Sequence, residues 1–338
     1  MVPFLIVLGS YVDDAFGGAQ TRAQAKLVID TLILIGHLTA TIVNPEKTRG
    51  PATSLVILGL LYCSVSRTCR LGEDKQAKYL ARIAAMVAST STTSKELEKL
   101  VGNLGFAAWV EPFGRPLLSC LYAAVVRDDP SAKVPITHLL RSALGVWFRI
   151  ISRNRGLQYR FILNELPVVK TPIFVDASTS WGVGGVHGRD YFTVPHAVIR
   201  SHIRSCPGWE SYPQVPIAWL ELLAAYVAVR LFASRYTNRL MVLYTDNSNV
   251  VAWLGTRRSP RPVVCTLVSA IESIKYHHSL KLSVRFIPSD QNRTADFLSR
   301  NVVPRWLQSR GSPLTPDMAG IAYAADMNNI LDLWTTVI

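Results

Sequence analysis

Four segments decide how this chain folds: TPIFVDAS (171–178), IAWLELLAA (217–225), LMVLYTDN (240–247) and NRTADFLSR (292–300). The first and third are short apolar runs rich in β-branched residues, which predicts buried strands, whereas the second is apolar all round and predicts a buried helix. Between residues 171 and 300 the apolar segments predict three strands, a buried helix, a fourth strand, two helices, a fifth strand and a closing helix. This order indicates an α/β domain.

Each of the four segments carries one carboxylate, at a strand end or on a helix: Asp176, Glu221, Asp246 and Asp296. A charged carboxylate in apolar surroundings loses several kcal/mol of hydration unless positive charge replaces the water. No Lys or Arg stands directly beside any of the four, so a divalent cation is the expected source of that charge. Carboxylate oxygens are ligands that Mg²⁺ and Mn²⁺ prefer, and two ions about 3.5–4 Å apart can hold both oxygens of a phosphodiester displacement.

The same motifs resemble the ribonuclease H domain of retroelement reverse transcriptases, since FVDAS, the helix glutamate, YTDN and ADFLSR occur in the family's order. The resemblance covers residues 167–300 and is closest to retrotransposons of the LTR or DIRS type. It implies a five-stranded mixed sheet with flanking helices, and catalytic and metal-binding roles for all four carboxylates. It also implies two Mg²⁺ ions, with Mn²⁺ as an alternative, and hydrolysis of RNA in RNA–DNA hybrids.

Residues 1–66 resemble part of a reverse transcriptase palm. YVDD (11–14) lies between apolar segments, like the palm hairpin whose aspartates, here Asp13 and Asp14, hold metal ions for nucleotide addition. A palm also needs an earlier aspartate and the fingers. The resemblance therefore implies a chain truncated at its N-terminus, which would polymerise DNA only with a partner chain that supplies the fingers.

Further elements are predicted on either side of residue 66. The capping-box pattern at Thr21–Gln24 predicts a helix to about residue 37, and apolar runs predict strands at 41–48 and 54–61. Residues 67–160 are predicted to be largely helical and resemble the thumb and connection of the same enzymes. Five arginines of this part either follow a nucleic-acid backbone or form a solvated helix face: Arg141, Arg149, Arg153, Arg155 and Arg160.

Within residues 167–300, the most basic patch is a candidate for binding nucleic acid, with a plain surface loop as the alternative: Arg257, Arg258 and Arg261. The glycines of GVGG (182–185) predict close strand packing or close approach of a hybrid backbone. The proline-containing segment 195–216 predicts a long irregular connection. The loop 287–292 lacks the histidine found in many ribonucleases H, so catalysis is expected to rely on the metals.

The chain has 338 residues and a formal net charge of +13, which predicts two or three domains and a polyanionic partner such as a nucleic-acid backbone. The apolar runs near the N-terminus are shorter than the roughly 20 residues of a transmembrane helix, so no membrane partner is expected. The five cysteines contain no C-x-x-C pair, which indicates an intracellular, reducing compartment, cytoplasmic or nuclear. The segment 301–338 contains several prolines and is predicted to be a tail with a short helix at 326–337. Its sequence indicates no function.

Two other interpretations stay open. In the first, the chain is a catalytically inactive nucleic-acid-binding relic of a retrotransposon. In the second, it is a transposase or integrase of the same fold, although transposases and integrases usually place a glutamate on the last helix, where this chain has Asp296.

Overall fold

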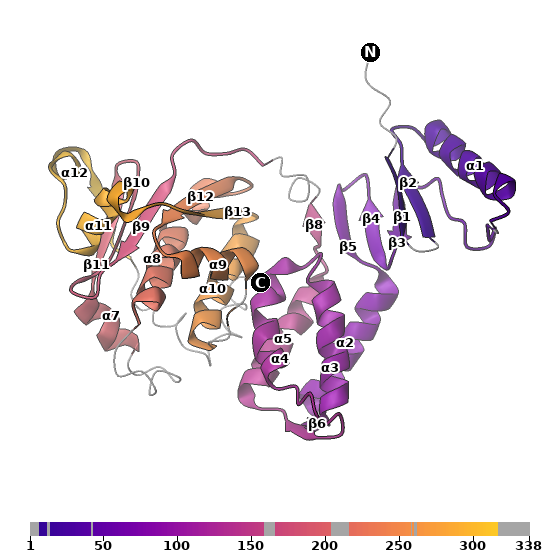
Figure 1. Cartoon of the computed structure of the whole chain (residues 1–338), viewed down its shortest axis with the longest axis horizontal. Helices are drawn as coiled ribbons and strands as arrows, with labels where there is room; N and C mark the ends of the chain where they lie inside the picture. Colours follow the sequence, from indigo (N-terminus) through magenta and orange to yellow (C-terminus); the bar gives the residue numbers. More distant parts are fainter. Residues whose placement is uncertain are drawn as a thin grey trace, which may run out of the picture.

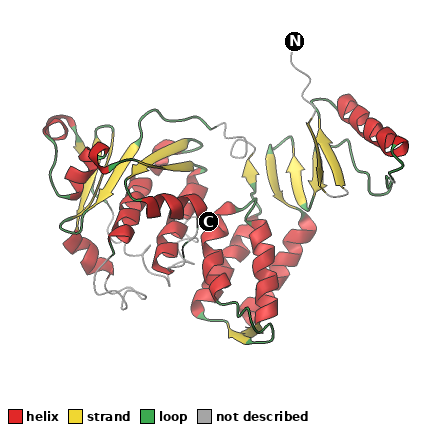
Figure 2. Cartoon of the chain, viewed as in Figure 1, coloured by secondary structure: helices red, strands yellow, loops and turns green. Residues whose placement is uncertain are grey.

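The computed structural model of the chain describes residues 7–11, 14–41, 43–158, 166–203, 216–257, 259 and 262–316. The chain runs through three consecutive parts: a hairpin with one helix, a small sheet beside a helical bundle, and a larger mixed sheet flanked by helices (Figure 1). The last part begins with three consecutive strands, after which groups of helices separate single strands, and Figure 2 shows this mixture of strands and helices. The predicted α/β class is therefore confirmed.

The N-terminal hairpin forms as predicted. β1 (Val7–Tyr11) and β2 (Asp14–Gly18) pair antiparallel, with Asp14 opposite Tyr11. Asp14 is exposed, whereas Asp13 lies outside the described residues. α1 (Arg22–Leu38) follows with the predicted capping box, in which the backbone N–H of Gln24 donates to Thr21 Oγ1 at 3.2 Å.

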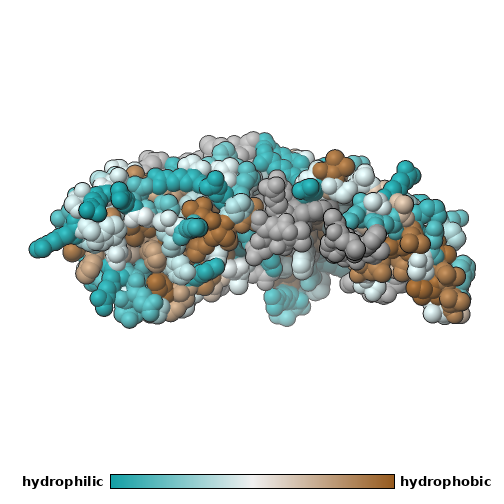
Figure 3. Space-filling model, turned by 90° about the horizontal axis from the view of Figure 1, so that it is seen from above, coloured by the Kyte–Doolittle hydropathy of each residue, from teal (hydrophilic) through white to brown (hydrophobic). Residues whose placement is uncertain are grey.

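The apolar side of α1 is largely uncovered. Gly36 is the only buried residue of this helix. Its large exposed apolar side chains are Leu27, Leu34, Ile35 and Leu38. Figure 3 shows hydrophobic surface at the end of the molecule where α1 lies in Figure 1. Among the described residues, nothing covers this face.

Two strand predictions in the N-terminal part need correction. The strand predicted at 41–48 is wrong, because the Asn44 side chain accepts from the backbone N–H of Glu46 at 2.9 Å and so stabilises a turn. The strand predicted at 54–61 is a hairpin of β3 (Ser54–Ile57) and β4 (Leu60–Cys63). Two residues with positive φ, Leu58 at 51° and Gly59 at 80°, form its tight turn.

The second part combines a four-stranded antiparallel sheet, in the order β3-β4-β5-β8, with the predicted helices. Its remaining elements are β5 (Thr68–Leu71), α2 (Glu73–Ala88), β6 (Ser91–Thr93), α3 (Ser94–Ala107), η1 (Pro112–Leu117), α4 (Leu118–Ala123), β7 (Lys133–Pro135), α5 (His138–Arg153) and β8 (Leu157–Gln158). Buried Asn154 ties helix to sheet, since its side chain accepts from Leu71 N–H at 3.0 Å and donates to Leu71 O at 2.9 Å.

The third part is built on a mixed sheet in the order β13-β12-β9-β10-β11-β14. Its elements are β9 (Ile173–Ala177), β10 (Gly182–His187), β11 (Asp190–Pro195), α7 (His196–Ile203), α8 (Ile217–Phe232), η2 (Ala233–Tyr236), β12 (Leu240–Thr245), α9 (Ser248–Thr256), α10 (Pro262–His278), β13 (Lys281–Phe286), η3 (Ser289–Gln291), α11 (Arg293–Ser299), α12 (Arg305–Arg310) and β14 (Ser312–Pro313). β9, β10 and β11 are antiparallel, whereas β12 is parallel to both β9 and β13. The predicted order of nine elements is confirmed, and the fold is ribonuclease H-like.

Two details differ from the prediction. The sheet has six strands, because β14 in the proline-containing segment pairs parallel with β11. The segment 195–216 is not wholly irregular, because residues 196–203 form α7, and residues 204–215 lie outside the described residues. The short helix predicted at 326–337 also lies outside them.

Alternate residues of β10 face opposite sides of the sheet. Val183 belongs to the large core with α8, whereas Val186 packs with Leu298 of α11 and Leu307 of α12. Among the described residues, Ile217–Tyr236 is the one helix long and apolar enough to cross a membrane, and 72% of its most apolar window is buried within the protein. The length of this helix was not predicted, since the prediction rested on the apolar runs nearer the N-terminus.

The helical part packs against α10 through η1. Phe113 and Tyr276 make an edge-to-face contact with ring centroids 5.0 Å apart, and the Arg155 guanidinium lies 5.0 Å from the centroid of the Tyr276 ring. Glu111, at the start of η1, is fully buried and accepts from Gly156 N–H at 2.7 Å. Its second oxygen has no hydrogen-bond partner among the described residues, and burial raises its pKa from 4.5 to about 7.

We expect Glu111→Gln to flatten the pH dependence of stability. A folded-state pKa above the unfolded value means that the folded chain binds more protons, so wild-type stability falls as pH rises from 4.5 to about 7. At neutral pH the free energy of unfolding of the wild type is therefore lower than at pH 4.5 by on the order of 3 kcal/mol. Glutamine keeps the acceptor for Gly156 and cannot ionise. Urea unfolding between pH 4.5 and 8 measures this, and Glu98→Gln on the exposed side of α3 is the control; a variant with the wild-type slope would contradict it.

Candidate active site

Three of the four predicted carboxylates meet at one edge of the larger sheet. Asp176, Glu221 and Asp246 each offer an oxygen, and these oxygens all lie within 4.8 Å of one another. Among the described residues, this is the one group of three or more acidic, histidine or cysteine side chains arranged to hold a metal ion. We refer to Asp176, Glu221 and Asp246 as the carboxylate triad.

Asp176 reaches the triad from the central strand β9 and is 5% exposed. Its pKa is raised from 3.8 to about 6, chiefly by burial and also by the negative charges of Asp246 and Asp296, whereas the Ser299 hydroxyl and Arg300 oppose this rise. Asp176 lies directly opposite Gly184 of β10. Its side chain therefore projects from the face of the sheet that Gly184 presents to α11.

Glu221 comes from α8, whose apolar residues hold it against the sheet at 4% exposure. Its pKa is raised from 4.5 to about 9, chiefly by burial and also by the neighbouring charges of Asp176 and Asp246, against the opposing effect of a hydrogen bond from the Ala177 backbone. Its Oε2 atom is buried and has no hydrogen-bond partner within the part of the chain that is described. A buried acceptor without a partner is costly, and a cation in the triad would satisfy it.

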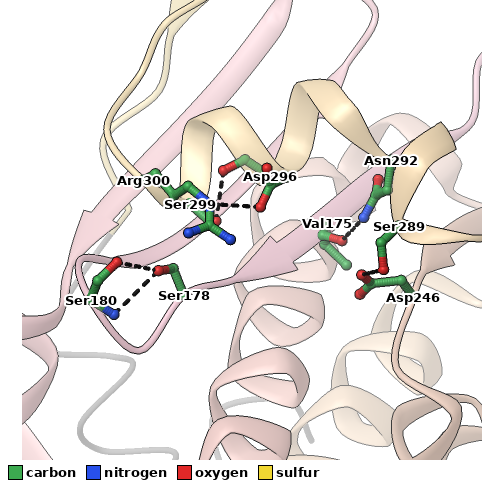
Figure 4. A network of polar contacts seen from close by, with 9 residues as sticks. All are labelled: Val175, Ser178, Ser180, Asp246, Ser289, Asn292, Asp296, Ser299 and Arg300. Atoms are coloured by element: carbon green, nitrogen blue, oxygen red, sulfur yellow. Dashed lines mark hydrogen bonds and ion pairs between the residues drawn. The ribbon is translucent and has the colours of Figure 1, made fainter.

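Asp246 follows the last residue of β12 and is half-buried. The Ser289 hydroxyl donates to its Oδ2 at 2.6 Å and so fixes the orientation of the carboxylate (Figure 4). The next residue, Asn247, caps α9 by accepting from Asn249 N–H at 3.0 Å. The strand end and the helix start thus hold Asp246 between two rigid elements.

The fourth predicted carboxylate, Asp296, lies beside the triad but outside it. It accepts from Arg300 Nε at 2.8 Å, one helical turn away on α11 (Figure 4). The expectation that none of the four carboxylates has a cationic partner rested on direct sequence neighbours and is wrong for Asp296, whose i,i+4 spacing from Arg300 could have indicated this pair. The pairing raises the pKa of Arg300.

Side chains of the segment that precedes and forms α11 hold this edge together, and the sequence analysis assigned them no role. Buried Asn292 donates to the backbone oxygen of Val175 at 2.9 Å, which fixes the start of α11 to β9 beside Asp176 (Figure 4). Ser299 is fully buried and donates to the backbone oxygen of Asp296 at 2.9 Å. The sequence signal that could have indicated this role is the presence of short polar residues, Asn292 and Ser299, in the loop and the closing helix.

Gly184 sets the distance between α11 and the sheet. A Cβ atom there would lie 2.5 Å from the backbone C of Leu298 and N of Ser299, closer than any real contact. The glycines of 182–185 therefore serve strand and helix packing, one of the two roles predicted for them. A side chain at this position must push α11 away.

We expect Gly184→Ala to destabilise the chain by about 1–3 kcal/mol, because backbone atoms cannot yield as a flexible side chain does. The displacement moves Asp296 and Ser299 relative to Asp176. Any catalytic activity of this site is therefore expected to fall by a larger factor than the fraction of folded protein. Gly255→Ala is the matched control, since a Cβ at this position, in the last turn of α9, meets nothing within 4 Å and should stabilise the helix slightly. Chemical unfolding of both variants tests this, and equal stability would contradict it.

The predicted basic patch is described only at Arg257, since Arg258 and Arg261 lie outside the described residues. Arg257 Nε lies 3.4 Å from Glu272 Oε2 of α10, and Lys275 also pairs with this buried glutamate. Its guanidinium is thus engaged with a buried carboxylate. Asp14 of the N-terminal hairpin was also predicted to hold a metal ion. It lies in a different part of the molecule from the triad (Figure 1).

The triad suits a hard divalent cation. It offers oxygen ligands only, and one of these, Glu221 Oε2, is buried without a hydrogen-bond partner among the residues that the structure describes. Two of its members have raised pKa values that positive charge would lower. Asp296 stands beside it, where displacement of Arg300 would free a further oxygen.

The chain was compared with known proteins. No protein-family model matches it, and no curated protein does. Among solved structures, it is similar to the foamy viral protease-reverse transcriptase dRH in complex with double-stranded DNA, at 15% identity and a TM-score of 0.41, over 83% of this chain and 46% of that one. It is also similar to the foamy viral protease-reverse transcriptase in complex with an RNA/DNA hybrid, at 10% identity and a TM-score of 0.34, over 87% and 58%. The chain spans about half the length of these proteins.

Proposed function

We propose that the chain is a metal-dependent nuclease that cleaves the RNA strand of RNA–DNA hybrids, as part of a retroelement reverse transcriptase. The convergence of Asp176, Glu221 and Asp246 within 4.8 Å on a ribonuclease H-like sheet carries the proposal. Buried carboxylates without cationic partners destabilise a fold, and metal-dependent phosphodiester hydrolysis gives this arrangement a use.

The triad and Asp296 would hold two Mg²⁺ ions, or Mn²⁺ in their place. When bound, such ions lower the pKa of the attacking water and stabilise the charge on the leaving 3′ oxygen, so that the product carries a 5′-phosphate. Ser289 keeps the Asp246 carboxylate oriented, and Asn292 keeps α11 fixed to β9. These contacts hold the ligands in place before substrate arrives, which is what catalysis by positioning requires.

The ion pair between Asp296 and Arg300 gives the arginine a role in the proposed mechanism. Arg300 supplies the positive charge beside Asp296 and, through it, beside Asp176. If Asp296 held a cation, the Arg300 guanidinium would no longer be needed to balance its charge and would be free to contact a phosphate of the substrate. The hybrid would be recognised by its 2′-hydroxyls and backbone shape.

The N-terminal part supports a second, dependent role. The β1–β2 hairpin with Asp14 and the uncovered apolar face of α1 are consistent with part of a polymerase palm. RNA-directed DNA synthesis would also need fingers and a further metal-binding aspartate. The purified chain alone should not extend a primer.

The experiment that tests the proposal is incubation of the purified chain with an RNA–DNA hybrid labelled on the RNA. Cleavage in Mg²⁺ or Mn²⁺ that chelator abolishes, with 5′-phosphate ends and no cutting of double-stranded DNA, would support it. Binding without cleavage in either metal would leave an inactive nucleic-acid-binding relic. Strand transfer of DNA ends would instead indicate a transposase or integrase.

A further inference from the structure

We propose that α11, α12 and the turn between them form a surface that binds the backbone of a nucleic-acid duplex beside the carboxylates. This surface, residues 293–310, holds four arginines and a single aspartate: Arg293, Arg300, Arg305, Arg310 and Asp296. The inference rests on the proposed function, since it places the substrate of that same site.

Two of the arginines are available to a ligand. Arg305 and Arg310 are exposed on α12 and form no ion pair or side-chain hydrogen bond with the part of the chain that is described. Arg293 and Arg300 make local contacts, to the Asp290 backbone oxygen and to Asp296. Figure 3 shows hydrophilic side chains projecting from the end of the molecule where α12 lies in Figure 1.

Exposed apolar side chains are interleaved with these arginines. Phe297, Val302 and Trp306 are 44%, 51% and 47% exposed, respectively. Aromatic faces next to arginines stack on sugars and bases while the guanidinium groups contact phosphates. A protein interface of the same size would be depleted of charge at its centre, whereas this surface is densely basic.

The surface is rigid, as a site for a duplex backbone should be. Leu298 and Leu307 are fully buried against Val186 of β10, and Val302 N–H donates to Phe297 O at 2.8 Å across the turn. The following strand β14 fixes the far end, since Leu314 N–H donates to Tyr191 O at 2.7 Å. A Cβ on Gly311 would lie 2.5 Å from Leu307 O, so glycine is needed for this close return.

The location ties the surface to catalysis. α11 carries Asp296 and Ser299, whose hydroxyl interacts with Asp176, and α12 begins five residues after Arg300. A duplex whose scissile phosphate lies at the triad would extend over neighbouring helices. The alternative basic position, Arg257, is engaged with Glu272 instead.

The test measures binding of a labelled RNA–DNA hybrid by fluorescence anisotropy in Ca²⁺ at several salt concentrations. We expect R305Q/R310Q to weaken binding several-fold and to reduce the salt slope by about 2, because each phosphate contact contributes about 0.9. Trp306→Ala should weaken binding without changing the slope. Arg239→Gln is the control, since Arg239 is exposed before β12, at the opposite end of that strand from Asp246.

Cleavage assays separate this inference from the proposed function. If both hold, R305Q/R310Q raises KM and leaves kcat at saturating hybrid close to wild type. A wild type that binds but does not cleave would defeat the proposed function alone, provided the variant still loses affinity and slope. Unchanged affinity and slope in R305Q/R310Q would overturn this inference, and a change only in oligomeric state by light scattering would assign the surface to protein association instead.

Discussion

Replacing Asp246 with asparagine is expected to abolish hybrid cleavage in Mg²⁺ while leaving the fold intact. Asparagine has the same shape and can still accept from the Ser289 hydroxyl, which lies 2.6 Å from Oδ2. It lacks the charge that holds a metal. Loss of one ligand should remove several kcal/mol of transition-state stabilisation, a fall of about 10³-fold or more in rate.

The measurement follows the labelled RNA strand on a denaturing gel, with thermal unfolding as the check on folding. Asp246 is half-buried, so the melting temperature should change little. Asp128→Asn, an exposed residue of the helical part, should keep full activity and controls for a co-purifying nuclease. If D246N cleaves the hybrid as fast as the wild type, the triad is not the active site.

The carboxylate triad could be predicted from sequence because its members interrupt apolar segments. Glu221 lies within a buried helix and Asp176 in a buried strand, where a charge is conspicuous. Once the order of strands is known, their ends meet at one edge of the sheet. Asp296 lies on the closing helix, as predicted, but its ion pair with Arg300 depends on the i,i+4 helical spacing and not on direct sequence neighbours.

Features that depend on distant contacts could not be predicted. β14 is a strand of two residues, one of them proline, and it exists because β11 offers it an open edge. Arg257 has a basic sequence neighbourhood, yet it faces Glu272, fifteen residues later on α10. Glu111 gives no sequence sign that Gly156 and Tyr276 enclose it.

The second large effect concerns Glu221, where stability and function oppose each other. Its pKa of about 9 lies far above the 4.5 of an ordinary glutamate, so the folded chain binds more protons at this site than the unfolded chain. In chelator, stability should therefore fall as pH rises from 4.5 to about 9. Near neutral pH the cost is on the order of 3 kcal/mol.

Glu221→Gln should accordingly be inactive and, in chelator at pH 8, more stable than the wild type. The amide cannot ionise, and its N–H groups can donate to Asp176 and Asp246, whose oxygens lie within 4.8 Å. Chemical unfolding in chelator measures the gain, with Glu98→Gln, exposed on α3, as the control. A less stable variant would mean that Glu221 has a favourable partner instead of a buried, unsatisfied oxygen.

Metal should reverse this order. A cation competes with protons on Asp176 and Glu221, whose pKa values are about 6 and about 9, so its affinity rises with pH. At about 100 times the dissociation constant, Mn²⁺ should stabilise the wild type by about 2.7 kcal/mol, and more strongly at pH 8 than at pH 6 for a fixed concentration. E221Q should show little of this gain, because the missing charge weakens the site. Equal stabilisation of both proteins by Mn²⁺ would place the metal elsewhere, and the destabilising carboxylate at position 221 would then need another explanation.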